Sequence, residues 1–214
     1  MRPNRSFPTV TSFFRDPDLF EALRHFVLPA LLRRRHPEKK LTIWCAACSH
    51  GQEAYSIAIL LREYFPTLLA NWQFEFIATD ISSTAIARAR NGEYSTEEIA
   101  RRLPEKYIRR YFTRRGEAWT VSPELRLLVE FNELDLCEDW SIVPKPIDLV
   151  FMRNVLIYYD RATRKHILDR MLSTLRPDGY LFLGATETIV SLGNIFEPVR
   201  FDKAIGYQAR QSSA

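Results

Sequence analysis

Short apolar runs alternate along this chain with stretches in which apolar residues recur every three or four positions. Continuous runs are typical of strands buried on both faces, whereas the three-to-four spacing is typical of helices with one apolar face. Strands are predicted at residues 41–47, 74–80, 127–135, 147–154 and 180–186, with a closing strand pair at 199–209.

Helix signals occupy the segments between these strands. Ser49 is the candidate N-cap of the helix that begins near Gly51. Ser82 or Ser83 is the candidate N-cap of the helix that follows the second strand. Residues 177–179, Pro-Asp-Gly, predict a turn. Helices are predicted at residues 17–35, 52–65, 84–90 and 160–175. This alternation predicts an α/β fold with a Rossmann-like, doubly wound, mostly parallel sheet.

Residues 93–131 interrupt the alternation. They read as two short helices followed by a strand, a Ser-Pro turn and a further strand. We interpret this segment as a small helical and β subdomain inserted into the core. Such an element suits docking of a partner better than chemistry, and a plain crossover decoration is the alternative.

Composition narrows the class of protein. The chain has 214 residues, 46% hydrophobic and 26% charged, which suits one globular α/β domain. No apolar run reaches the roughly 18 residues that a membrane span needs, and the N-terminus lacks a signal core. We therefore expect a cytoplasmic protein without membrane insertion. The net charge of +4 is mild, and the basic clusters lack interleaved aromatic residues, so nucleic acid is not expected as a partner.

The stretch "IWCAACSHGQE" at residues 43–53 contains Trp-Cys-x-x-Cys, a pattern associated with dithiol redox sites. A redox Cys should stand at a helix N-terminus, where its thiol pKa is lowered. Cys45 instead lies within the predicted strand, and the third cysteine, Cys137, is isolated. The remaining Cys and His residues lack the spacing of a zinc site, so no metal is expected.

The ends of the predicted strands carry the candidate chemistry, because ligands in open α/β sheets bind beyond these ends. Asp80 ends the second strand, where an acidic residue can accept hydrogen bonds from a ribose diol. The loop at Gly51 contains small residues but no Gly-x-Gly-x-x-Gly, which disfavours nicotinamide and flavin cofactors. Glu53 is either a surface residue of the first helical turn or a partner for a cationic ligand group. S-adenosylmethionine (SAM) combines a ribose, an amino-acid moiety and a positive centre.

Five segments, taken in order, resemble the chemotaxis receptor methyltransferases, the CheR family. The similarity runs from Thr9 to Tyr207, and the pairing of an early Phe-Phe-Arg-x-Pro with a much later Arg-Asn-Val-Leu-Ile-Tyr is its most specific part. The segments are "TSFFRDPDLF", "IWCAACSHGQEAYSIAILL", "ATDISSTAIARARNGEY", "DLVFMRNVLIYYD" and "LRPDGYLFLGATETI".

The resemblance implies a SAM-dependent protein-glutamate O-methyltransferase that forms γ-methyl esters on methyl-accepting chemotaxis receptors. The implied partner is the cytoplasmic helical region of these receptors, and the product of the cofactor is S-adenosylhomocysteine. Two alternatives stay open: methylation of another carboxylate acceptor, and a non-catalytic signalling or binding module with this fold.

The resemblance also implies site residues. Arg15, Arg153 and Tyr158 are the expected catalytic residues. Arg15 is expected near the methionine part of the cofactor or the incoming glutamate, and Tyr158 near the acceptor carboxylate. Asp135 stands where the family more often has Asn, which would supply amide donors that Asp lacks. The expected cofactor-binding residues are Thr9, Thr11, Arg15, Gly51, Glu53, Asp80, Asp135, Leu136, Arg153 and Asn154.

Two departures from the family pattern are visible. Only about eight residues precede Thr9, where family members usually carry an N-terminal helical domain, so residues 9–214 are interpreted as the catalytic domain. The segment 114–125 is short and lacks the Gly-x-Gly insertion of members that bind a receptor tether peptide. We therefore expect a protein that acts without a tether. We also expect it to be a monomer.

Overall fold

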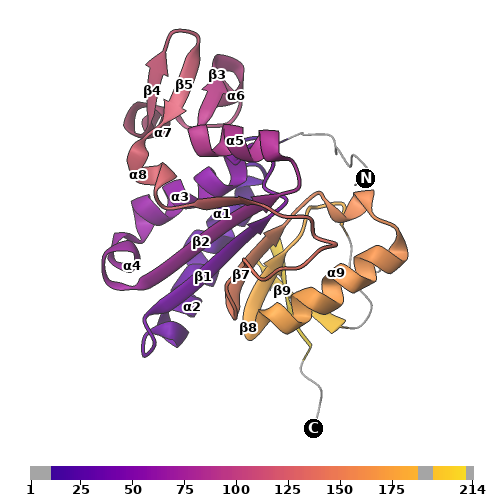
Figure 1. Ribbon diagram of the computed structural model, residues 1–214. Helices are drawn as coiled ribbons and strands as arrows, with labels where there is room; N and C mark the ends of the chain where they lie inside the picture. The colour runs from indigo at the N-terminus through magenta and orange to yellow at the C-terminus, as the bar shows by residue number, and fades with distance from the viewer. Residues whose placement is uncertain (1–10, 188–194, 211–214) are drawn as a thin grey trace.

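A seven-stranded sheet forms the centre of the described residues, in the order β6-β2-β1-β7-β8-β10-β9 (Figure 1). The computed structural model describes residues 11–187 and 195–210. Strands β6, β2, β1, β7 and β8 are parallel, and β10 is antiparallel to both of its neighbours. The strands are β1 Lys40–Ala46, β2 Gln73–Asp80, β6 Glu130–Glu133, β7 Ile147–Met152, β8 Leu175–Phe182, β9 Phe196–Phe201 and β10 Ala204–Ala209.

Helices cover both faces of this sheet. Alternate residues of β1 show the division: Ile43 and Cys45 pack into one apolar cluster with α3, whereas Trp44 and Ala46 pack into a second cluster with α9. The predicted doubly wound, mostly parallel fold is therefore confirmed. The helices of the core are α1 Pro17–Ala22, η1 Leu23–Val27, α2 Leu28–Arg35, α3 Gln52–Tyr64, α4 Pro66–Asn71, α5 Ser83–Asn91 and α9 Arg161–Thr174, with the short 3-10 turn η2 Leu156–Tyr158 before α9.

A separate three-stranded sheet stands at one end of the central sheet, at the top of Figure 1. Its strand order within the described residues is β3-β5-β4, and both pairings are antiparallel. Ser95 begins the adjoining helix with a capping box, in which its hydroxyl accepts from the Glu98 N–H and the Glu98 carboxylate accepts from the Ser95 N–H. The elements are β3 Glu93–Ser95, α6 Thr96–Ala100, α7 Glu105–Tyr111, β4 Phe112–Arg115, β5 Ala118–Val121 and α8 Pro123–Arg126.

Several local predictions are confirmed. Ser82 caps α5 by accepting a hydrogen bond from the Ala85 N–H, and the final strand pair is present as β9 and β10. The long helix predicted before β1 exists, although a π-helical turn, η1, divides it. Every helix of the described ranges falls short of the length and apolar character needed to cross a bilayer.

Other local predictions are wrong. Gly51, not Ser49, is the N-cap of α3, since Ser49 adopts a left-handed φ of 53° and its side chain makes no capping bond. The expected Ser-Pro turn at residue 122 opens the helix α8, because Pro fits the first helical turn. The turn expected at 177–179 lies within β8, where irregular pairing with β7 leaves extra residues bulged out of register.

A buried ion network ties helix α2 to the amino-terminal edge of the sheet. The Nε of Arg35 donates to Asp148 at 2.6 Å, and its Nη1 donates to Asp178 at 3.0 Å. The second oxygen of Asp148 accepts from the Thr42 N–H at 2.9 Å. Burial alone would lower the pKa of Arg35, but hydrogen bonds to Asp178 and Asp148 outweigh it and raise that pKa. The network therefore joins α2, β1, β7 and β8.

Replacing Asp148 by Ala should lower the free energy of unfolding by about 3 kcal/mol, because it leaves the buried Arg35 guanidinium short of one partner. Urea denaturation with an unchanged m-value measures this loss. Arg62→Ala is the matched control, since the Arg62–Glu124 pair is 37% and 43% exposed and should contribute at most about 1 kcal/mol. Equal losses in the two variants would contradict the assignment of Asp148 as a buried anchor.

Candidate active site

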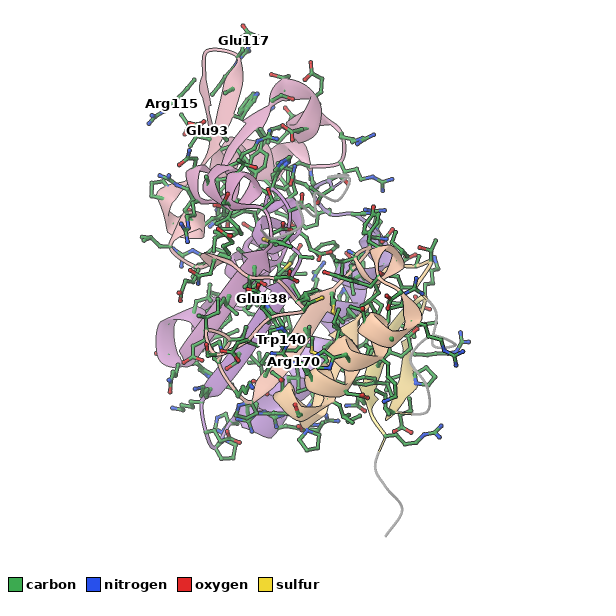
Figure 2. The ribbon with its side chains drawn as sticks, turned by 45° about the vertical axis from the view of Figure 1, so that its right-hand side comes forward. Glu93, Arg115, Glu117, Glu138, Trp140 and Arg170 are labelled. Atoms are coloured by element: carbon green, nitrogen blue, oxygen red, sulfur yellow. The ribbon has the colours of Figure 1, made fainter. Side chains whose placement is uncertain are left out.

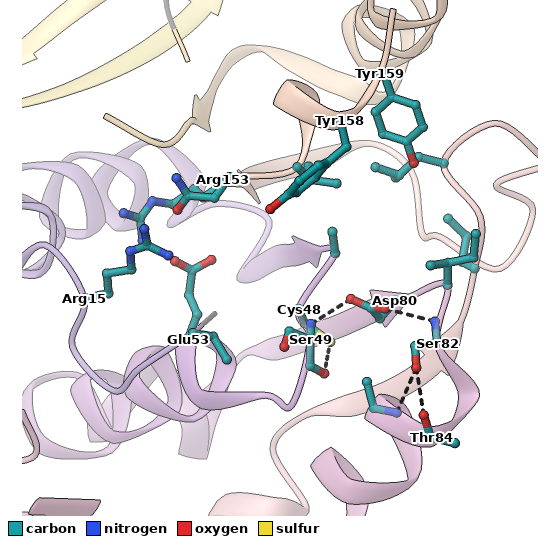
Figure 3. Close-up of a pocket in the computed structure, with 18 of the residues that line it drawn as sticks. Arg15, Cys48, Ser49, Glu53, Asp80, Ser82, Thr84, Arg153, Tyr158 and Tyr159 are labelled. Atoms are coloured by element: carbon teal, nitrogen blue, oxygen red, sulfur yellow. Dashed lines mark hydrogen bonds and ion pairs between the residues drawn. The ribbon is translucent and has the colours of Figure 1, made fainter. Parts of the chain in front are cut away.

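A cavity of about 280 Å³ opens beyond the carboxyl ends of β1, β2, β6 and β7 (Figure 3). This is the edge at which ligands bind in open α/β sheets. The N-terminal segment before α1 and the turn before α9 supply the remaining wall. The lining residues are Thr11, Ser12, Arg15, Ala47, Cys48, Ser49, Glu53, Asp80, Ile81, Ser82, Thr84, Ala85, Leu134, Leu136, Arg153, Asn154, Val155, Tyr158 and Tyr159.

The backbone around this cavity is unusual. Ala47, Ser49 and Asn154 line it with φ values of 57°, 53° and 58°, in the left-handed region that non-glycine residues rarely adopt. Phe14 and Asp16, on either side of Arg15, have φ values of 46° and 60°. Residues held in such conformations cluster at ligand sites, where surrounding contacts enforce them. The chain therefore turns sharply at three separate approaches to the cavity.

Asp80 is fixed at the end of β2 by two backbone donors. One oxygen accepts from the Ser49 N–H at 2.8 Å, and the other accepts from the Ser82 N–H at 2.9 Å (Figure 3). These bonds join the loop after β1 to the start of α5. Each carboxylate oxygen has a second lone pair, so the fixed group can still accept from ligand hydroxyls.

Arg153 occupies the other side of the cavity, with a side chain that is only 4% exposed. Its guanidinium donates to Glu53 and to Asp16, which come from α3 and from the turn before α1. Burial by itself would lower the pKa of Arg153, but the Glu53 and Asp16 carboxylates outweigh burial and raise it. Figure 3 shows that Arg15 and Glu53 extend toward this same side. The result is a compact group of opposite charges.

Apolar and aromatic side chains complete the wall. Leu134 and Leu136 follow β6, are buried, and provide an apolar part of the wall that also contains Asp80. Tyr158 is 39% exposed, and Figure 3 shows its hydroxyl directed into the cavity. The cavity thus has a polar and apolar side for a nucleoside-like group, a charged side, and a tyrosine hydroxyl at its opening.

The two cysteines of the Trp-Cys-x-x-Cys stretch are free thiols. Cys45 is buried in β1 and its Sγ–H donates to Glu53 at 3.5 Å; Cys48 is buried in the following loop. Burial, reinforced by Glu53 for Cys45 and by Asp80 for Cys48, raises the pKa of both thiols well above the usual range. A redox or metal-binding pair needs thiolates, so this environment opposes both roles. Among the described residues, no cluster of His, Cys, Asp and Glu could hold a metal ion.

The cavity brings together most of the residues implicated by the sequence. Gly51 and Asp135 do not reach its wall, and Thr9 lies outside the described residues. Those on the wall are Thr11, Arg15, Glu53, Asp80, Leu136, Arg153, Asn154 and Tyr158.

Local contacts explain the positions of Gly51 and Asp135. A side chain on Gly51, at φ 85°, would place a Cβ 2.9 Å from the Cβ of Ala89, so this glycine permits close packing of α3 on α5. The Asp135 carboxylate accepts from the Cys137 N–H at 2.8 Å and closes a local turn.

Three polar residues near the cavity were not predicted as site residues from the sequence. Asp16 pairs with Arg153, and Ser49, a lining residue, has a buried hydroxyl without a hydrogen-bond partner among the described residues. Glu187 is buried behind the wall and bonds to the segment that follows Arg153. A carboxylate just after an apolar strand was the available signal for Glu187, because such a group must find donors when buried.

Comparison with known proteins shows which family this chain is similar to in sequence. Residues 9–205 match the family model described as "CheR methyltransferase, SAM binding domain". The chain is 40% identical to chemotaxis protein methyltransferase Cher2 of Pseudomonas putida and 39% identical to chemotaxis protein methyltransferase 1 of Pseudomonas aeruginosa. Each alignment spans 203 residues and covers 94% of this chain and 73% of the relative. A chemotaxis protein methyltransferase of Borreliella burgdorferi is 36% identical over 183 residues, covering 84% of this chain and 64% of the relative.

Replacing Cys45 and Cys48 together by Ala should leave SAM affinity within about threefold, because neither thiol carries charge. Isothermal titration calorimetry on the double variant and the parent chain measures this. The parent thiols should also resist iodoacetamide at neutral pH until the protein is unfolded. Rapid labelling of the folded protein, or loss of binding with the fold retained, would restore a chemical role for the pair.

Proposed function

This chain belongs to the CheR methyltransferase family, and from this membership we propose that it methylates side-chain carboxylates of glutamates in chemotaxis receptors. The observation that carries the proposal is that Asp80 and the charged group formed by Glu53, Arg153 and Arg15 line one cavity. This arrangement suits a cofactor with a ribose at one end and an amino-acid group at the other, while Tyr158 stands where an acceptor enters.

The residues present fit SAM. Asp80 has the lone pairs to accept both ribose hydroxyls, and Leu134 and Leu136 offer an apolar surface for adenine. Two buried polar atoms on the wall, the Oγ of Ser49 and the Nε of Arg153, have no partner among the described residues. Such groups cost free energy unless a ligand or water satisfies them. Glu53 supplies a carboxylate for the cofactor's ammonium group, and Arg153 a donor for its carboxylate.

Bound SAM supplies a methyl group on a sulfonium, so that the C–S bond breaks to leave a neutral thioether as a C–O bond forms to the acceptor. The acceptor glutamate is already ionised at neutral pH, so no residue of this chain has to remove a proton. The chain's contribution is therefore to position the acceptor and to exclude water.

Arg15 and Tyr158 are the residues best placed for that positioning. Arg15 offers a planar guanidinium that can bind a carboxylate through two parallel hydrogen bonds. The Tyr158 hydroxyl, directed into the cavity, adds one donor. Arg153 is committed to Glu53 and Asp16, so its charge is compensated and does not hold the acceptor too tightly. This division leaves the carboxylate oriented but reactive.

The inserted sheet suits receptor docking without a tether peptide. Strands β4 and β5 are joined by only Gly116 and Glu117, with Gly116 at a φ of 61°. Such a two-residue connection leaves no extended loop that would close over a peptide. Figure 2 shows Arg115 and Glu117 projecting outward at this tip. We assign this subdomain to direct contact with the helical methylation region of the receptor.

Replacing Asp80 by Ala should weaken SAM binding by about 1–3 kcal/mol, because ribose hydroxyls lose a charged acceptor. Calorimetry on the folded variant measures the change. Asp139→Ala is the matched control, since Asp139 also accepts a backbone N–H, from Ser141, but lies outside the cavity wall. Unchanged affinity in Asp80→Ala would remove this residue from the cofactor site.

The function itself is tested by transfer of a labelled methyl group from SAM to cytoplasmic fragments of chemotaxis receptors. The expected product is base-labile and releases labelled methanol. Arg15→Ala should lower turnover by about tenfold or more while SAM affinity changes less than threefold, because the guanidinium orients the acceptor. Arg62→Ala, an exposed position on α3, should match the parent.

Two outcomes would contradict this assignment. Tight SAM binding without transfer to any receptor fragment would favour a signalling module, and transfer only to another carboxylate would change the acceptor class. Loss of SAM affinity in Arg15→Ala with normal turnover would place Arg15 on the cofactor instead.

A further inference from the structure

A buried carboxylate behind the cavity wall connects two strand-end loops. Glu187 lies in the loop after β8 and is 6% exposed. Its Oε2 accepts from the Asn154 N–H at 2.6 Å and from the Gly184 N–H at 2.7 Å. Its Oε1 accepts from the Leu156 N–H at 2.7 Å. One side chain thus satisfies three backbone donors, two of which belong to the loop after β7.

The three hydrogen bonds also stabilise the negative charge of the Glu187 carboxylate. Leu156 is the first residue of η2, so Glu187 accepts from an N–H that has no partner within this short turn. Hydrogen bonds from N–H groups to a carboxylate are shorter and stronger than neutral ones. The described loop therefore gains a rigid anchor midway between Arg153 and Tyr158, both of which line the cavity.

The residues around Glu187 are closely packed. A Cβ added to Gly184 would lie 2.5 Å from the side-chain nitrogen of Asn154 and 2.8 Å from the Glu187 Oε2. Real Cβ atoms do not approach other heavy atoms so closely, so the absence of a side chain at this position lets the two loops meet. Asn154 itself holds a left-handed φ of 58°, which the Glu187 bond supports.

We propose that Glu187 is a positioning residue of the methyl-transfer site: its carboxylate holds residues 154–158 in the conformation that lines the cavity and aims the Tyr158 hydroxyl at the acceptor. The proposal rests on the function proposed above for its effect on turnover. The structural part of the proposal, the anchoring of residues 154–158 by Glu187, does not depend on which acceptor is methylated. Glu187 touches neither the cavity nor a reacting atom, so its role is exerted through Asn154 and Tyr158.

Replacing Glu187 by Gln tests the role with nearly the same shape. An amide has one acceptor oxygen, and its NH₂ group would face a backbone N–H that it cannot satisfy. The loop should then open locally while the rest of the fold persists. Asp160→Asn is the matched control, because Asp160 accepts the Thr163 N–H at the start of α9 and so caps the other end of the same connection.

The first measurement is hydrogen exchange of peptides spanning residues 150–160, followed by mass spectrometry, with S-adenosylhomocysteine bound. In Glu187→Gln the amides of Asn154 and Leu156 should exchange at least about tenfold faster, whereas those of β1 should be unchanged. Asp160→Asn should leave both sets of amides as in the parent. Unchanged exchange at Asn154 and Leu156 would overturn the proposal whatever the acceptor proves to be.

The second measurement separates positioning from simple stability. On a receptor fragment that the parent chain methylates, Glu187→Gln should lower kcat by about tenfold or more at a SAM Kd within threefold of the parent. The loss should shrink to less than about twofold in a Tyr158→Phe background, because both changes then remove the same interaction. Normal kcat, or a full additional loss in that background, would overturn the proposed route through Tyr158.

Gly184→Ala supplies an independent probe if Glu187→Gln does not fold. It keeps the carboxylate but pushes on Asn154 and Glu187, so it should reproduce the faster exchange and the lower kcat. If the parent chain methylates no receptor fragment, the proposed function fails, and the exchange data alone then support or overturn the anchor.

Discussion

Three distant parts of the chain meet at the guanidinium of Arg153. Asp16 comes from the turn before α1, Glu53 from the first turn of α3, and Arg153 from the end of β7. A side chain that is 4% exposed cannot carry a charge without partners, because the desolvation cost is several kcal/mol. The two carboxylates meet this requirement, and in doing so they bring Arg15 to the cavity. The shape of the site therefore follows from neutralising one buried cation.

The same constraint acts at the opposite edge of the sheet. There Arg35 is compensated by Asp148 and Asp178, and the β1 backbone donates to the same Asp148 carboxylate. Between these edges the central strands β1 and β7 are buried almost along their whole length, on both faces. At the amino-terminal edge the charges form ion pairs within the protein, and this edge is structural. The carboxyl-terminal edge borders the cavity that Ser49 and Arg153 line, and this cavity marks it as the ligand edge.

Periodicity in the sequence was sufficient to predict the sheet, its covering helices and the edge at which Asp80 lies, because these depend on local apolar patterns and on the geometry of parallel strands. Resemblance to a family added Arg15 and Tyr158. What could not be predicted depends on contacts between residues far apart in the chain. Asp16 pairs with a residue 137 positions away, and Glu187 bonds to a backbone N–H 33 positions away.

Backbone conformation also explains why predictions from local sequence patterns were wrong at two positions. Ser49 has the side chain of a helix cap but a left-handed φ, and its N–H instead donates to Asp80. Neighbouring residues that follow the same strand also need not both line the cavity. Leu136 lines it, whereas the Asp135 carboxylate accepts from the Cys137 N–H. Sequence spacing locates such a loop, but only the folded chain decides which of its side chains reach the cavity.

The balance of charge in the cavity suits the proposed reaction. An ionised carboxylate and a sulfonium become a neutral ester and a neutral thioether, so charge is lost on the way to the transition state. A site with a strong uncompensated field would stabilise the separated charges of the ground state more than the transition state. Arg153 is held between Glu53 and Asp16, and the Glu187 carboxylate is bound by backbone N–H groups behind the wall. The Arg153 and Glu187 charges therefore both have partners within the protein, and catalysis depends on the placement of acceptor and cofactor.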